Sequence, residues 1–142
     1  MPSRRLLSPA LLALALTLAA CAPRTGDAVA DGEDGARVTT EAGLEAALGQ
    51  SGFLLRPRGF TTDPLVSATA SEYTVGGTGS GYLQVYSFSS AEEAERDMRD
   101  VASRGVGGSV RVYQNGPLVV AFYGTDPALG ATLTRLLGPP TI

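Results

Sequence analysis

The chain has 142 residues and a formal net charge of −3, and its sequence contains no histidine, no lysine and no tryptophan. Without histidine or lysine there is no Ser-His-Asp or Cys-His pair, no histidine metal site, no Schiff-base lysine and no P-loop. The acidic balance argues against nucleic acid as a partner, and we expect no metal and no cofactor.

Residues 1–20 have the pattern of a secretory signal peptide. Arg4 and Arg5 precede the apolar run LLSPALLALALTLAA, which is short for a membrane span and is interrupted by Pro9. The run ends in Leu18-Ala19-Ala20-Cys21, and Cys21 is the one cysteine of the chain. This tetrapeptide resembles the lipobox of bacterial lipoproteins, in which the cysteine sulfur receives a diacylglycerol before cleavage and the new N-terminus is often acylated.

The resemblance implies a partner, the membrane, reached through covalent lipid such as palmitate on Cys21. Two or three acyl chains hold a protein stably at a bilayer, whereas one does not. The next residue is Ala22, not the aspartate that marks inner-membrane retention in many Gram-negative bacteria. We therefore expect an extracytoplasmic protein anchored in the cell membrane or the outer membrane. The alternative is an uncleaved anchor with an incidental cysteine.

Residues 21–37 are rich in Ala, Gly and Asp and show no hydrophobic period, which predicts a flexible tether. The single folded domain is expected at 38–142. Its first element is a short helix capped by Thr39 or Thr40 and ending near Gly49. A strand over 53–56 follows, and we expect Pro57 to stop it and 59–71 to be irregular.

Two further strands are expected, at 72–75 and 82–88, joined by the glycine-rich run GGTGSG at 76–81. That run lacks the lysine and the following helix of a phosphate-binding loop, so it predicts a hairpin turn. Ser90 and Glu93 then form a capping box that opens a helix over 90–104. Met98 belongs to the apolar stripe of this helix and is expected to be buried.

The last elements are a hairpin and a helix. Strands at 110–114 and 118–123 flank Asn115-Gly116, a dipeptide that favours a tight hairpin turn. Asp126 caps a helix over 126–137, in which Leu133 is expected to be buried. This order predicts the α+β class, with two layers: an antiparallel or mixed sheet of four to five strands and helices packed on one face.

Tyr82 and Tyr86 are the candidate partner surface. They share parity on one strand, so they point to the same sheet face, while Leu83 and Val85 point to the other. If the helices cover the leucine and valine side, the tyrosines form an open aromatic patch, with Tyr113 or Tyr123 as additional members. The alternative is ordinary half-buried packing of the rings against the sheet.

Charged side chains offer a competing site. Arg56 and Arg58 flank Pro57, and together with Arg111 they could clamp a carboxylate if the fold brings them together. Asp63 and Glu72 are a second hypothesis, a carboxylate pair, although their spacing does not require proximity. The simpler interpretation of the three arginines is ordinary solvent-facing side chains.

The segments EAGLEAALGQSGF, YLQVYSFSSAEEAERDM and GPLVVAFYGTDPALGATLTRLLGPP are together similar to a widespread group of small bacterial lipoproteins of uncharacterised function. The shared motifs are structural, so the resemblance implies the lipid anchor and an α+β domain but no catalytic residue. We favour a non-enzymatic binding or interaction module of the cell envelope, whose protein partner the sequence does not identify. The alternative is an envelope enzyme or small-ligand sensor that uses Asp63, Glu72, Arg56 and Arg111.

Overall fold

The structure is a computed structural model that describes residues 37–103 and 109–142. The predicted signal peptide, Cys21 and all of the predicted tether except Arg37 lie outside the described residues. No helix within the described ranges is long and apolar enough to cross a membrane.

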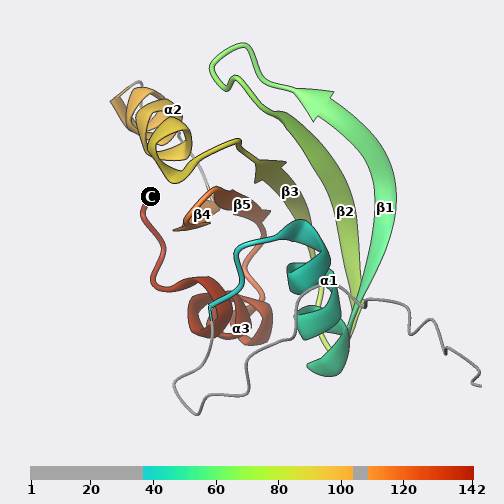
Figure 1. Cartoon of the computed structure of the whole chain (residues 1–142). Helices are drawn as coiled ribbons and strands as arrows, with labels where there is room; N and C mark the ends of the chain where they lie inside the picture. The colour runs from blue at the N-terminus through green and yellow to red at the C-terminus, as the bar shows by residue number, and fades with distance from the viewer. Residues whose placement is uncertain (1–36, 104–108) are drawn as a thin grey trace, which may run out of the picture.

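Within the described residues, three helices and five strands follow one another in the order that the sequence predicts (Figure 1). In chain order they are α1 (Glu41–Gln50), β1 (Phe53–Thr62), β2 (Thr69–Gly77), β3 (Gly81–Ser87), α2 (Ala91–Ser103), β4 (Val110–Asn115), β5 (Leu118–Tyr123) and α3 (Pro127–Leu137). The strands form one sheet in the order β1-β2-β3-β5-β4, and every neighbouring pair is antiparallel. The predicted α+β class with an antiparallel sheet is confirmed.

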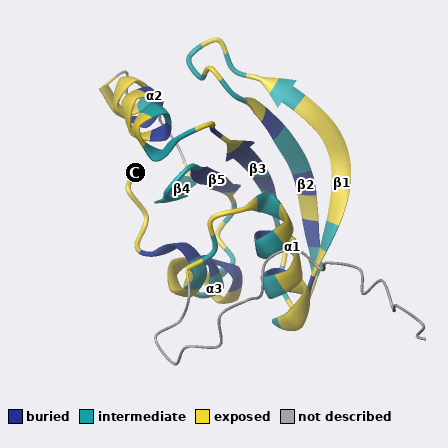
Figure 2. Ribbon diagram, in the orientation of Figure 1, coloured by how far each residue is buried: buried dark blue, intermediate teal, exposed yellow. Residues whose placement is uncertain are grey.

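The two sides of the sheet carry separate hydrophobic clusters. On one side, which we call the α1/α3 face, Leu83 and Val85 of β3 pack with Leu44 of α1 and Leu133 of α3. On the other side, the α2 face, a second cluster includes Tyr86 of β3 and Met98 of α2. Burial of Met98 and Leu133 is therefore confirmed. Figure 2 shows the helices exposed outward and buried toward the sheet, with the central strands the most deeply buried.

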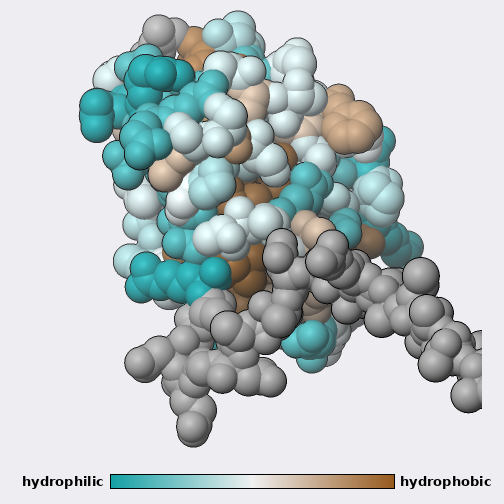
Figure 3. All heavy atoms as spheres, in the orientation of Figure 1, coloured by the Kyte–Doolittle hydropathy of each residue, from teal (hydrophilic) through white to brown (hydrophobic). Residues whose placement is uncertain are grey.

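The placement of α2 differs from the prediction that the helices over 90–104 and 126–137 share one sheet face. The stripe of Ala94 and Met98 packs beneath α2 on the side opposite α3. An amphipathic stripe specifies which side of a helix is buried, but not which sheet face receives it. The outward side of α2 is charged, and hydrophilic residues gather over this helix in Figure 3.

β1 is longer than the predicted strand and continues through Pro57 to Thr62. The strand lies at the edge of the sheet, where the missing N–H of a proline costs no ladder hydrogen bond. The register shifts between Pro57 and Gly59, so Arg58 is the extra residue of a bulge. The expectation of irregular chain over 59–71 is therefore wrong at both ends, because β2 already begins at Thr69.

The predicted N-terminal caps are present, except that the Glu93 carboxylate accepts from Ser89 and Ser67 and not from the Ser90 N–H, so only the Ser90 half of the capping box forms. The Thr40 side chain accepts the Gly43 N–H at 3.2 Å, and the Ser90 hydroxyl accepts the Glu93 N–H at 3.2 Å. Asp126 accepts the N–H groups of Ala128 and Leu129 at the start of α3. Each cap satisfies helix donors that have no partner within the helix.

Candidate functional site

Tyr82 and Tyr86 lie on one side of β3, as strand parity predicts, and that side is the α2 face. Tyr82 is half-buried, but Tyr86 is only 5% exposed, because the α2 face is covered at that end of the strand. The prediction that both rings form an open partner surface is therefore wrong for Tyr86. Tyr113 points to the α1/α3 face, whereas Tyr123 lies directly opposite Tyr82 on β5.

The polar side chains of this face form one hydrogen-bonded network. Tyr82 donates its hydroxyl to Glu72 Oε1, and Gln84 Nε2 lies 3.4 Å from the same oxygen. Gln84 Oε1 accepts from Tyr123 at 2.9 Å and from Tyr86 at 3.2 Å. The Tyr82 and Tyr123 rings also contact each other, with centroids 5.4 Å apart. Three strands thus contribute to a connected layer of tyrosine, amide and carboxylate.

Glu72 determines the direction of these hydrogen bonds. A carboxylate only accepts, so the amide of Gln84 must turn its NH₂ group toward Glu72. The carbonyl oxygen of Gln84 is then left for Tyr86 and Tyr123, and both hydroxyls must donate to it. Because a tyrosine hydroxyl has one proton, the remaining lone pairs on both oxygens can only accept.

The tyrosine pKa values reflect this environment. Burial, followed by neighbouring groups that include Asp63, raises the pKa of Tyr86 to about 12. Burial and then the charges of Asp63 and Glu72 also raise the pKa of Tyr123. The negative charges of Asp63 and Glu72 therefore disfavour ionisation of both hydroxyls.

A pocket of about 260 Å³ lies between α2, the β1–β2 loop and the α2 face of the sheet. Aliphatic side chains make up most of its lining: Leu65, Val66, Met98, Val101, Val110, Val112, Val119 and Ala121. The polar side chains in the lining are Tyr86, Tyr123 and Asp63. Tyr86 and Tyr123 of the layer built on Gln84 thus border a mainly apolar space, since three of its eleven lining side chains are polar.

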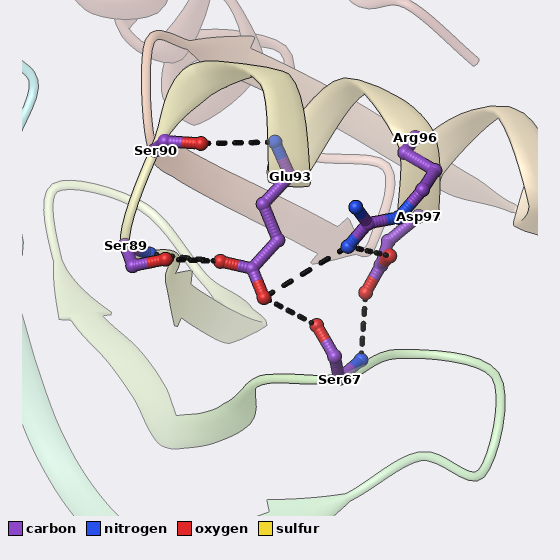
Figure 4. Close-up of polar contacts among 6 residues, drawn as sticks. All are labelled: Ser67, Ser89, Ser90, Glu93, Arg96 and Asp97. Atoms are coloured by element: carbon purple, nitrogen blue, oxygen red, sulfur yellow. Dashed lines mark hydrogen bonds and ion pairs between the residues drawn. The ribbon is translucent and has the colours of Figure 1, made fainter.

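The β1–β2 loop, which forms one wall of this pocket, is bound to α2 by a cluster of polar side chains (Figure 4). The Ser67 N–H donates to Asp97 Oδ2 at 2.7 Å, and the Ser67 hydroxyl donates to Glu93 Oε1 at 3.1 Å. Arg96 lies 3.5 Å from Asp97 and 3.9 Å from Glu93. Asp97 is 7% exposed whereas Ser67 is exposed, so the hydrogen bond between them is partly shielded from water. These contacts hold the pocket wall in place.

The predicted arginine clamp does not assemble. Arg58 lies on the α2 side, with its guanidinium carbon 6.0 Å from the centre of the Tyr82 ring. Arg111 lies on the opposite face, 4.8 Å from the centre of the Phe122 ring, and packs against Gly130 of α3. Arg56 pairs with Thr74, next to Tyr82 in the sheet, so the sheet separates it from Arg111. Of the two predicted carboxylates, Asp63 lines the pocket and Glu72 belongs to the tyrosine layer.

Sequence reasoning missed Gln84 and the pocket. The parity that grouped Tyr82 with Tyr86 also places Gln84 between them on the same face, so this residue could have been found. The pocket depends on which face α2 covers, and the sequence carries no local signal for that choice. Among the residues that the structure describes, no group of three or more acidic or cysteine side chains is placed to hold a metal ion.

Comparisons with protein-family models, with curated proteins and with solved structures give no match to this chain. The resemblance to small bacterial lipoproteins therefore stays a prediction.

Proposed function

We propose that the chain is a non-enzymatic binding module, held by lipid on Cys21 at the extracytoplasmic side of a bacterial membrane, and that it binds a small ligand in the α2 pocket. The proposal replaces the open tyrosine patch with a partly open pocket on the α2 face. One observation carries it: the aliphatic pocket of about 260 Å³ has polar side chains on only part of its wall. Apolar concave sites with a few converging polar groups are typical of ligand sites.

The hydrogen bonds from Ser67 to Asp97 and Glu93 of α2, which we call the Ser67 strap, support this proposal. An empty cavity lined by aliphatic side chains costs free energy, and it persists only where the surrounding structure is prevented from collapsing into it. Asp97 and Glu93 hold the loop against α2 through Ser67, so the space is maintained by polar contacts outside it. Such pre-organisation lowers the cost of binding, because the wall needs little further ordering.

The alternative is an envelope enzyme or a small-ligand sensor, and the pocket supports ligand binding rather than an enzyme. The arginines that the alternative requires do not meet: Arg111 is on the α1/α3 face, whereas Asp63 lines a pocket on the α2 face. The Tyr86 and Tyr123 hydroxyls donate their hydrogen bonds to Gln84, and burial raises the pKa of both tyrosines. Neither hydroxyl is poised to transfer a proton near neutral pH.

The test uses residues 22–142, which lack the signal peptide and the lipid site but keep every residue that the structure describes. The chain is titrated with 1-octanol while the methyl NMR signals of Met98, Val101 and Val112 are followed. We expect these signals to shift and saturate, whereas those of Leu44 and Leu133, in the other cluster, stay in place.

Ala121→Leu extends a side chain into the pocket and should abolish the shifts. Ala128→Leu is the matched control on the exposed surface of α3 and should leave them unchanged. Val101→Phe is a second blocking variant, in case Ala121→Leu perturbs the sheet. Absence of saturable shifts in the unmodified chain, or equal shifts in both clusters, contradicts the proposal.

A further inference from the structure

The charge in the pocket lining is of one sign. Asp63 is the one ionisable carboxylate or base among the described lining residues, and it is half-buried. Its Oδ1 accepts the Leu65 N–H at 2.8 Å, which fixes the carboxylate at the start of the β1–β2 loop. Within the described residues Asp63 forms no ion pair. A charge in this position, beside an apolar space, favours a cation as its partner.

The tyrosine oxygens point to the same preference. Tyr86 and Tyr123 donate to Gln84 and keep only lone pairs, as the Glu72 contact of Gln84 requires. The polar side chains that line the pocket therefore offer acceptors: the Asp63 carboxylate and the lone pairs of the Tyr86 and Tyr123 hydroxyls. An ammonium group has donors and no acceptor, so it satisfies such a site, whereas a carboxylate is repelled by it.

The size of the pocket limits the rest of the ligand. An apolar cavity of about 150 Å³ holds benzene, so by proportion a space of about 260 Å³ holds roughly ten non-hydrogen atoms. Val112, Val119 and Met98 present no hydrogen-bonding group to this space, which suits an aliphatic or aromatic body.

From this geometry we infer that the pocket binds a small amphiphilic amine, with its ammonium group at Asp63 and the Tyr86 and Tyr123 oxygens and its apolar body against α2 and β5. This inference rests on the proposed function, because it names the ligand class of the same pocket. Arg58 does not oppose it, because its guanidinium is directed at the Tyr82 ring outside the pocket lining.

The test compares octylammonium, 1-octanol and octanoate, which share one apolar body and differ in the head group. Residues 22–142 are titrated with each, and dissociation constants are taken from the methyl signals of Met98 and Val112. We expect octylammonium to bind about tenfold more tightly than octanol, the difference that a charge-assisted hydrogen bond in a partly buried site supplies, and octanoate to bind most weakly.

Asp63→Asn removes the charge but keeps the oxygen that accepts from Leu65, so the loop is retained. It should abolish the preference for octylammonium while octanol binding is unchanged. Ser109→Asn, an exposed change outside the pocket lining, should leave the preference intact. If a chemical-shift map shows that Asp63→Asn disturbs the loop, Asp63→Glu is used, and it should keep the preference.

The outcomes separate this inference from the proposed function. Equal binding of octylammonium and octanol, tighter binding of octanoate, or an unchanged preference in Asp63→Asn overturns the amine inference and leaves the pocket as a binding site. If none of the three probes binds, the proposed function fails together with the inference.

Discussion

The backbone N–H of Ser67 donates to the carboxylate of Asp97 across 2.7 Å, and this contact joins two segments 30 positions apart in the chain. Asp97 is the buried charged residue of α2, and its pKa is the outcome of opposing effects. Burial raises the pKa of Asp97, but the hydrogen bonds from Ser67 and the charge of Arg96 outweigh burial, so the net pKa is lowered. The carboxylate is therefore stabilised in its charged form by the loop that it holds.

Asp97→Ala is expected to lower the free energy of unfolding by about 1.5–3 kcal/mol, the range for a hydrogen bond to a charged group. Urea unfolding of residues 22–142 measures this change. Asp100→Ala is the matched control, because Asp100 is on the exposed side of the same helix and should be near neutral. An equal loss in both variants would show that the effect comes from the helix and not from the strap.

Acid should destabilise the folded chain through the same contacts. The hydrogen bonds from Ser89 and Ser67 lower the pKa of Glu93, and the net pKa of Asp97 is also lowered. A depressed folded-state pKa contributes stability above the unfolded value, about 4, and this stability is lost as the pH falls through the folded value. The free energy of unfolding is measured between about pH 6 and pH 2. It should fall less in the double variant Glu93→Gln/Asp97→Asn than in the unmodified chain. If the free energy of unfolding changes with pH equally in both chains, the effect does not come from Glu93 and Asp97.

Alkali should destabilise the chain through Tyr86. Its folded-state pKa is raised to about 12, so its contribution to stability is complete below the unfolded value of about 10. This contribution is lost as the pH rises from about 10 through the folded value. Tyrosinate absorbance and unfolding should change together in this interval. Tyr86→Phe keeps the ring and should flatten the dependence, and a persistent dependence would assign it to other tyrosines.

Leu133 tests the α1/α3 cluster. Its side chain is fully buried, and Leu133→Ala should cost about 2–4 kcal/mol, because the change removes apolar contacts and leaves a cavity. Leu54→Ala is the matched control: Leu54 is 56% exposed on the edge strand and should change stability by less than about 0.5 kcal/mol. Similar urea midpoints for the two variants would contradict the placement of α3.

Cys21 tests the predicted anchor. In a bacterial host that processes lipoproteins, the unmodified chain should lose residues 1–20 and gain the mass of two or three acyl chains on Cys21. Cys21→Ser should keep its signal peptide and carry no lipid, because serine lacks the sulfur that accepts the diacylglycerol. Mass spectrometry of the membrane fraction measures both forms. An unmodified Cys21 with residues 1–20 still attached would refute the anchor.

Local sequence determined the elements of this protein. Thr40, Ser90 and Asp126 start helices because each side chain reaches N–H groups only two or three positions away. Asn115-Gly116 forms the hairpin turn through an equally local effect, because Gly116 adopts a positive φ of 58° that glycine tolerates. The shared face of Tyr82 and Tyr86 follows from the two-residue period of a strand.

Tertiary structure alone decided which groups meet. β5 lies between β3 and β4, so Tyr123 comes to lie opposite Tyr82 although 41 positions separate them in the chain. The side of the sheet on which α2 packs decides which side chains face the pocket. These choices depend on packing between residues distant in sequence, where many arrangements satisfy the same local preferences. The order of the elements and the helix starts could therefore be predicted from the chain, whereas the length of β1 and the pocket at Asp63 could not.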